Sequence, residues 1–218
     1  TRSTTISIQL TERQRVTALY ASAMAPNGDG GEILFRGITD AIKDIGLNSI
    51  PITQNLNVIE LADAVKPSII SSEIDFNTGR LILYGSEFLD NTPSTNLNLA
   101  RVFMIDTNSG IDGDMSPLSL TGATVEAGNN NTLALVLTET QRVRCIQASG
   151  TPGGDGTALK LTVLEHAVSD LSNNLNINSS NVFVKEINDT RVPTIDRVIL
   201  DLDSGVLSLF CSETIDIT

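Results

Sequence analysis

Apolar and polar residues alternate over several short stretches of the chain, and a turn signal follows most of them. Residues 69–76 and 80–84 alternate on either side of Asn77-Thr78-Gly79, which predicts a β-hairpin. Further strands are predicted over residues 5–10, 33–35, 58–61, 100–105, 118–125, 132–137, 158–163 and 182–187. Many short strands with frequent turns favour an all-β sandwich.

Two stretches depart from this alternation and predict short helices, over about residues 11–22 and 138–148. Thr11 and Thr138 each stand at the N-cap position, and a glutamine follows three residues later in both cases. This is the capping-box pattern, in which the two side chains satisfy free backbone N–H groups at the helix start. Residues 38–45 are weakly amphipathic, and we expect another short helix there and in the counterpart, residues 163–171.

A long internal repeat organises the chain. The heptad LTERQRV at Leu10–Val16 returns as LTETQRV at Leu137–Val143, an offset of 127. Further matches follow in the same order at an offset of 126, and the hairpin of residues 69–84 finds a counterpart over residues 195–210. Several ordered matches at nearly one offset indicate repeated structural units.

The repeat sets the expected domain boundaries. Pro67 and Pro193 occupy the same position near the start of a unit. We therefore expect residues 66–191 to form one complete unit of about 126 residues. Residues 1–65 then correspond to the C-terminal part of a preceding unit, and residues 192–218 to the N-terminal hairpin of a following one.

The openings of the two later units resemble a known family. Residues 75–90 read DFNTGRLILYGSEFLD, and residues 201–216 read DLDSGVLSLFCSETID. Both phrases resemble the opening of bacterial Ig-like (SbsA-type) sandwich domains, and they are similar to tandem repeats in large cell-surface proteins of aquatic microbes. The resemblance implies an all-β fold of Ig-like β-sandwich repeats with short helices, an extracellular location and a structural or adhesive role. It brings no catalytic residues.

The composition narrows the range of partners. Hydrophobic residues make up 40% of the chain and aromatic residues only 4%, which predicts an aliphatic core. The net charge of −12 argues against nucleic acid, because phosphate binding needs clustered lysine and arginine. No run is long and apolar enough to span a membrane. Cys145 and Cys211 have apolar neighbours, so buried free thiols are the default, and a disulfide stays open.

The sequence carries no recognisable catalytic constellation, and we expect that the protein is not an enzyme and needs no cofactor. Its one histidine, His166, has no nucleophile motif beside it. The glycine-rich loops at residues 28–31 and 153–156 lack the Lys-Ser/Thr of a phosphate-binding loop. Their recurrence predicts a required turn, since glycine adopts positive φ without steric cost.

An acidic stretch offers oxygen ligands for a metal ion. Asp106, Asn108, Asp112 and Asp114 follow one another closely. Calcium prefers several carboxylate and carbonyl oxygens, but this stretch lacks the glycine spacing and the closing glutamate of an EF-hand. The stretch is therefore interpreted either as a Ca²⁺ site or as a solvated acidic turn, and the sequence favours the turn.

Three N-x-S/T sequons predict N-linked glycosylation, provided that the chain is secreted by a eukaryote. The acceptors are Asn130, Asn178 and Asn188, and none has a proline at the middle position. All three lie near predicted loops or strand ends, where an exposed acceptor can be reached.

A unit divided at both ends leaves strand edges without partners, and such edges pair with another chain unless they are covered. We therefore expect a structural subunit of an extracellular filament or surface fibril, glycosylated and assembling head to tail with itself by β-strand complementation. Such a heterologous contact produces an open homopolymer. The residues expected to make it are Val192, Pro193, Ile195, Val198, Leu200, Val206, Leu207 and Leu209. The alternative is an extracellular adhesin, or a carbohydrate- or ice-binding module, that uses calcium.

Overall fold

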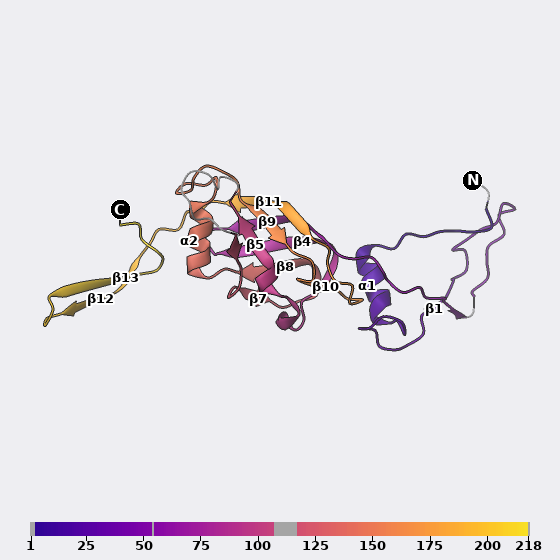
Figure 1. Ribbon diagram of the computed structural model, residues 1–218. Coiled ribbons are helices and arrows are strands. Elements are labelled where there is room, and N and C mark those ends of the chain that lie inside the picture. Colours follow the sequence, from indigo (N-terminus) through magenta and orange to yellow (C-terminus); the bar gives the residue numbers. More distant parts are fainter. Residues whose placement is uncertain (1–2, 54, 107–116, 218) are drawn as a thin grey trace.

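The computed structural model describes residues 3–53, 55–106 and 117–217, and it is mostly β with short helices, as the sequence predicts. Its parts lie in a row (Figure 1). We name them the head segment (residues 3–65), the body (residues 66–191) and the tail hairpin (residues 192–217). The two ends of the chain lie at opposite ends of this row.

A curled sheet of nine strands builds the body. Its order is β6-β5-β9-β11-β3-β4-β8-β7, with β10 paired to β4. The strands are β3 (Ile69–Asp75), β4 (Arg80–Asp90), β5 (Val102–Ile105), β6 (Leu118–Ser119), β7 (Thr124–Glu126), β8 (Asn130–Val136), β9 (Lys160–Val163), β10 (Ser169–Asp170) and β11 (Ser179–Ile187). β11 runs parallel to β3 and antiparallel to β9. Because β11 pairs on both sides, the strands form one continuous curled sheet, whereas the sequence predicted the two separate sheets of a sandwich.

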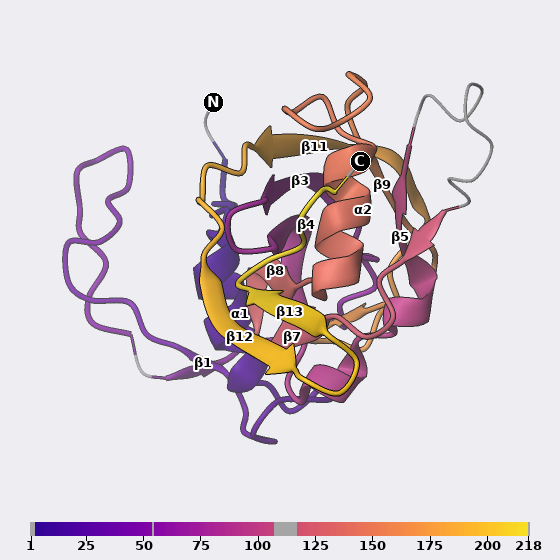
Figure 2. The ribbon, with the colours of Figure 1, turned by 90° about the vertical axis from the view of Figure 1, so that its left-hand side faces the viewer.

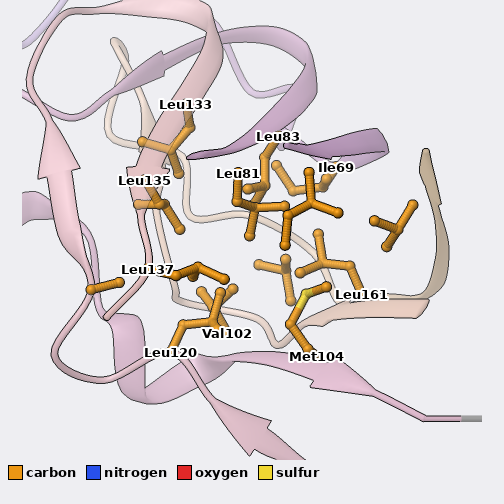
Figure 3. Close-up of a cluster of buried hydrophobic side chains, with 14 of the residues drawn as sticks. Ile69, Leu81, Leu83, Val102, Met104, Leu120, Leu133, Leu135, Leu137 and Leu161 are labelled. Carbon is orange, nitrogen blue, oxygen red and sulfur yellow. The ribbon is translucent and has the colours of Figure 1, made fainter. Parts of the chain in front are cut away.

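The core lies inside the curl and is aliphatic (Figure 3). Every second residue of β4 is buried from Leu81 onwards, as the alternation predicts, and the same holds in β5 and β9. Fully buried side chains include Leu81, Leu83, Val102, Leu120, Leu135, Leu159 and Leu161. Burying such a side chain stabilises the fold by about 1.5–3 kcal/mol, so this cluster holds the two sides of the curl together.

Both predicted helices form. α1 spans Glu12–Tyr20 and α2 spans Glu139–Gln147. In each, the N-cap threonine accepts a hydrogen bond from the backbone N–H of the glutamine three residues later, and the glutamine side chain accepts one from the threonine N–H. Both capping boxes are therefore confirmed. The short 3₁₀ helices η1 (Ser94–Asn96) and η2 (Leu99–Arg101) lie between β4 and β5.

The head segment contains α1 but little regular sheet. Among its described residues, the strands are β1 (Leu34–Phe35) and β2 (Leu56–Asn57), which pair with each other. The strands predicted over residues 5–10 and 58–61 do not form. Their counterparts in the body, β8 and β11, are held by pairing with β4 and β3, and no described strand takes that place beside the head segment.

Two other local predictions were wrong. Residues 38–45 and the corresponding residues 163–171 form no helix. Instead, Asp44 and Asp170 each close a tight loop by accepting from the backbone and side-chain N–H groups of the asparagine four residues later. An aspartate that caps its own loop competes with helical hydrogen bonding. The strand predicted over residues 118–125 is divided by a turn into β6 and β7.

The sequence repeat is also a repeat of local geometry. Leu47 and Asn173 occupy the same place in the loops described above, with φ of 67° and 63°. Further pairs at the offset of 126 share a positive φ: Asp40 with His166, Gly30 with Gly156, and Gly79 with Gly205. Since a positive φ is uncommon for residues other than glycine, these coincidences indicate that the head segment and the body follow one template.

The tail hairpin is the β-hairpin that the sequence predicts, made of β12 (Ile195–Asp201) and β13 (Val206–Cys211). Its turn glycine, Gly205, has the same φ of 69° as Gly79 between β3 and β4. Figure 2 views the molecule from this end, with the hairpin in front of α2. All residues of β12 are exposed, so the hairpin extends from the body without packing on it.

We expect one substitution to act very differently in the body and in the tail hairpin. Leu83→Ala removes a fully buried side chain and should lower the free energy of unfolding by about 2–5 kcal/mol. Leu209→Ala changes the equivalent residue, which is 54% exposed, and should lower it by less than about 0.5 kcal/mol in dilute protein. Urea denaturation measures both losses, and equal losses would contradict the exposed hairpin.

Candidate functional site

An arginine of each helix binds carboxylates from both sides of a boundary between repeat units. In the first cluster, which we call the head clamp, Arg15 of α1 contacts Glu12, Asp63 and Glu87. Its Nε and Nη2 donate to the two oxygens of Glu12 at 2.7 Å each. Nη1 donates to Asp63 Oδ2 at 2.6 Å, and Nη2 also donates to Glu87 Oε2 at 2.8 Å. Because Glu87 lies in β4, the head clamp ties the head segment to the body.

Arg142 of α2 makes the same set of contacts in a second cluster, the tail clamp. It pairs with Glu139 at 2.7 Å, with Asp189 at 2.5 Å and with Glu213 at 3.3 Å. Each of these residues follows its head-clamp counterpart by 126 or 127 positions. Since Glu213 follows β13, the tail clamp ties the body to the tail hairpin, and the two joints are built alike.

The helix starts position both clamps. Glu12 and Glu139 are the first residues of their helices, where the positive end of the helix dipole favours a carboxylate. Each arginine follows three residues later, on the same side of the helix. Glu12 Oε1 also accepts the backbone N–H of Phe88 at 3.0 Å, and Glu139 Oε1 accepts that of Thr214 at 3.0 Å. The clamps therefore hold the backbone of the following unit as well as its side chains.

Hydrogen bonding to the arginine stabilises the charged form of the glutamate at the start of each helix. Hydrogen bonding to Arg142 lowers the pKa of Glu139 to about 2, and hydrogen bonding to Arg15 lowers the pKa of Glu12. The same hydrogen bonds raise the pKa of each arginine. The Arg142 side chain is only 9% exposed, and it also donates to the carbonyl oxygen of Phe76 at 2.9 Å. The guanidinium of Arg142 is thus largely desolvated, whereas its partner Glu139 is 46% exposed.

The head clamp carries an additional acid. Asp170 of β10 joins Asp63 and Glu87, so that one oxygen of each carboxylate lies within 4.8 Å of the others. Burial and the nearby charge of Asp170 raise the pKa of Glu87 to about 7. Burial also raises the pKa of Asp170. Within the described part of the chain, no such group of three lies at the tail clamp.

Beyond the tail clamp, the tail hairpin exposes apolar side chains at positions that the body buries. Leu207 and Leu209 are 58% and 54% exposed, whereas their counterparts Leu81 and Leu83 are fully buried. All the residues that the sequence analysis assigns to assembly are exposed: Val192, Pro193, Ile195, Val198, Leu200, Val206, Leu207 and Leu209. Contiguous exposed apolar surface of this kind marks sites of interaction.

The head segment leaves the complementary positions open. Ile6 and Ile8 are 60% and 74% exposed, whereas their counterparts Leu133 and Leu135 in β8 are almost completely buried. In the body, these two leucines pack against β4, which is the counterpart of β13. The two ends of the molecule therefore expose the two halves of a contact that the body makes internally.

The three predicted sequons lie on the surface. Asn130, Asn178 and Asn188 are all exposed. Asn130 begins β8, whereas Asn178 directly precedes β11 and Asn188 directly follows it. Their positions at strand ends suit modification, and glycosylation stays a prediction.

The acidic stretch proposed as a calcium loop is only partly described. Asp106 Oδ1 accepts a hydrogen bond from Thr157 Oγ1 at 3.3 Å. Asn108, Asp112 and Asp114 lie outside the described residues. Calcium binding by this stretch therefore stays a prediction.

The remaining candidates have simple structural settings. Cys145 is buried and Cys211 half-buried, and both are free thiols, so no disulfide joins them. Burial raises the pKa of the Cys145 thiol to about 12. His166 is exposed in a turn with φ of 64°. Among the described residues, no helix combines the length and the apolar character needed to cross a bilayer.

Sequence reasoning missed the clamps, although a signal for them was present. The E-x-x-R spacing lies inside the repeated heptads, and Asp63 with Asp189 and Glu87 with Glu213 recur at the offset of 126. A charged residue repeated in every unit is expected to pair with another such residue. Asp170, the fifth residue of the head cluster, also recurs at this offset as Asp44, but its counterpart only caps a loop, so the repeat does not predict its place beside Asp63 and Glu87.

Removing the arginine of the tail clamp should destabilise the body. Arg142→Ala leaves Glu139, Asp189 and Glu213 without their cation and should lower the free energy of unfolding by about 3 kcal/mol, as for other buried pairs that lose one partner. Arg13→Ala changes an exposed arginine and should alter it by less than about 0.5 kcal/mol. Urea denaturation compares the two variants, and equal losses of free energy of unfolding would show that the tail clamp does not stabilise the body.

Stability should also fall as the pH rises through the titration of Glu87. The folded protein has a Glu87 pKa of about 7 against an ordinary value of 4.5, so it holds this proton more tightly than the unfolded chain does. The loss develops between these two values and approaches about 3 kcal/mol. Glu87→Gln, which keeps the shape without the charge, should remove it. Urea denaturation at about pH 5 and about pH 8, with a chelator present, measures this loss in the parent protein and in the variant. A variant that loses as much free energy of unfolding between the two pH values as the parent protein would contradict the prediction.

Comparison of the chain with protein-family models, with curated proteins and with solved structures found no match. The resemblance to Ig-like repeats therefore rests on the two phrases quoted above. The internal comparison between the head segment, the body and the tail hairpin carries the functional argument instead.

Proposed function

We propose that the protein is a structural subunit of an extracellular filament or surface fibril, in which the tail hairpin of one copy adds its strands to the head segment of the next. One observation carries this proposal: the two ends expose apolar side chains whose counterparts form the core of the body. Covering each of these side chains would stabilise the joint by about 1.5–3 kcal/mol before the cost of ordering is subtracted. Strand addition of this kind is an established mode of recognition between chains.

The body supplies the antiparallel part of the joint as a template. There, β4 pairs with β8, with Leu81 opposite Leu135 and Leu83 opposite Leu133. Transferred by the repeat offsets, this register places Leu207 opposite Ile8 and Leu209 opposite Ile6. The residue between them, Ser208, then lies opposite Ser7. Side chains alternate between the two faces of a strand, so Leu207 and Leu209 would face the same side as Ile6 and Ile8.

The body also supplies the parallel part of the joint. β11 runs parallel to β3, with Val184 opposite Ser72. The same transfer places Val58 of the head segment opposite Val198 of β12. The segment over residues 58–61 would then become the strand that the sequence predicts. The tail hairpin would thus insert between two parts of the head segment, pairing along both of its edges.

The arrangement of the two clamps favours repeated addition. The head clamp and the tail clamp make equivalent contacts. Each unit would therefore follow the preceding one in a similar orientation. The head segment and the tail hairpin lie at opposite ends of the molecule (Figure 1), so one copy cannot satisfy both of its own ends. A heterologous contact of this kind produces an open polymer.

The joint would be a shortened version of the curled sheet of the body. The tail hairpin and the head segment together hold counterparts of β3, β4, β8, β9 and β11, but none of β5, β6 and β7. The exposed sequons at Asn130, Asn178 and Asn188 support an extracellular, glycosylated subunit. They lie on the body, where glycans would not interrupt the proposed pairing of the ends.

Charging the apolar face of the tail hairpin should abolish assembly. In Leu207→Asp/Leu209→Asp, two carboxylates replace side chains that the joint would bury, and an unpaired buried charge is strongly unfavourable. The matched control is Ser208→Asp, on the opposite face of the same strand. We expect filaments in negative-stain electron micrographs of the parent protein and of the control, and single particles of the double variant.

The body should stay folded in both variants, because the tail hairpin lies outside its core. Circular dichroism and the melting temperature check this. Filaments formed equally well by the double variant, or discrete particles of the parent protein at every concentration, would overturn the proposal.

A further inference from the structure

Three carboxylates meet where the head segment joins the body. Asp63 belongs to the link from the head segment, Glu87 to β4 and Asp170 to β10. One oxygen from each lies within 4.8 Å of the other two. Like charges this close repel one another, and a cation between them would relieve the repulsion.

One oxygen in this cluster is buried without a partner. Glu87 is 7% exposed, and its Oε2 accepts from Arg15, but its Oε1 has no hydrogen-bond partner among the described residues. A buried carboxylate oxygen without a donor is costly, and native structures usually satisfy it with a hydrogen bond, a water molecule or an ion. This orphaned atom is an observation independent of the clustering.

The charges around the cluster do not balance. Glu12, Asp63, Glu87 and Asp170 supply four carboxylates, and Arg15 is the cation that contacts three of them. Burial raises the pKa of both Glu87 and Asp170, which shows that Arg15 does not compensate for the lost solvation. A divalent cation would leave the cluster close to neutral.

We propose that Asp63, Glu87 and Asp170 form a calcium-binding site at the joint between the head segment and the body. The three ligands offer oxygen alone, which suits a hard cation and not zinc or copper. A surface pocket lined by Leu19, Ser22, Asp63 and Ser172 reaches the cluster at Asp63. Calcium also accepts irregular ligand geometry more readily than magnesium does.

The bound ion would stiffen this joint. Asp63 lies in the stretch that connects the head segment to the body, and at present it is held by Arg15 and by hydrogen bonds from Ser172 and Asn174. An ion bound by Asp63, by Glu87 of β4 and by Asp170 of β10 would link the head segment to the body. All three ligands belong to one chain, so the site is independent of whether copies assemble.

Calcium titration of the chelator-treated full chain tests the proposal. We expect isothermal titration calorimetry to show one site, and the melting temperature to rise with calcium, because a ligand of the native state stabilises it. Asp170→Asn and Glu87→Gln should each weaken binding at least tenfold. The matched control is Glu213→Gln in the tail clamp, where no described carboxylates gather as Asp63, Glu87 and Asp170 do, and it should leave binding unchanged.

Glu87→Gln should keep the fold, because glutamine resembles the protonated side chain. No heat and no change in melting temperature with the parent protein would overturn the site. An equal response in the parent protein and in both ligand variants would do so as well, and would direct attention to residues 106–114.

Discussion

Pairing between the hairpin β3–β4 and the strands on either side of it is the interaction on which this architecture depends. β8 covers one edge of the hairpin and β11 covers the other, and the side chains along these edges make up much of the core. The same apolar positions recur at both ends of the chain, where nothing among the described residues covers them. This strand pairing is made inside the body, but each end of the molecule holds only one half of it. The same contact therefore explains why the body is packed and why the head segment and the tail hairpin expose apolar side chains.

The clamps add direction to this contact. Apolar side chains on a strand specify which face is buried, but they restrict the position along the strand less strongly. An arginine held by a glutamate one helical turn away, and bound at the same time by carboxylates from two units, has little freedom. Surface ion pairs stabilise proteins weakly, whereas Arg142 is largely buried and bound on several sides. We expect its main effect to be on the orientation between consecutive units.

The sequence predicted local structure where the signal was local. The capping boxes, the two hairpins and the aliphatic core follow from residues close together in the chain. The curl of the sheet does not, because β11 looks the same in sequence whether it pairs with one strand or with two. The segment over residues 5–10 alternates like a strand yet stays unpaired, since a strand needs a neighbour. The clamps joined residues 48 and 72 positions apart, which only the repeat offset could have suggested.

Cysteine cross-linking in a fixed register tests the central claim most directly. Ser7→Cys and Ser208→Cys, in a background that carries Cys211→Ser, place thiols at the counterparts of Ala134 and Ile82, which lie opposite each other in the body. The account predicts a ladder of disulfide-linked oligomers after mild oxidation, and far less cross-linking when Ser204→Cys in the hairpin turn replaces Ser208→Cys. Monomers alone from the matched pair, or equal ladders from both pairs, would contradict it.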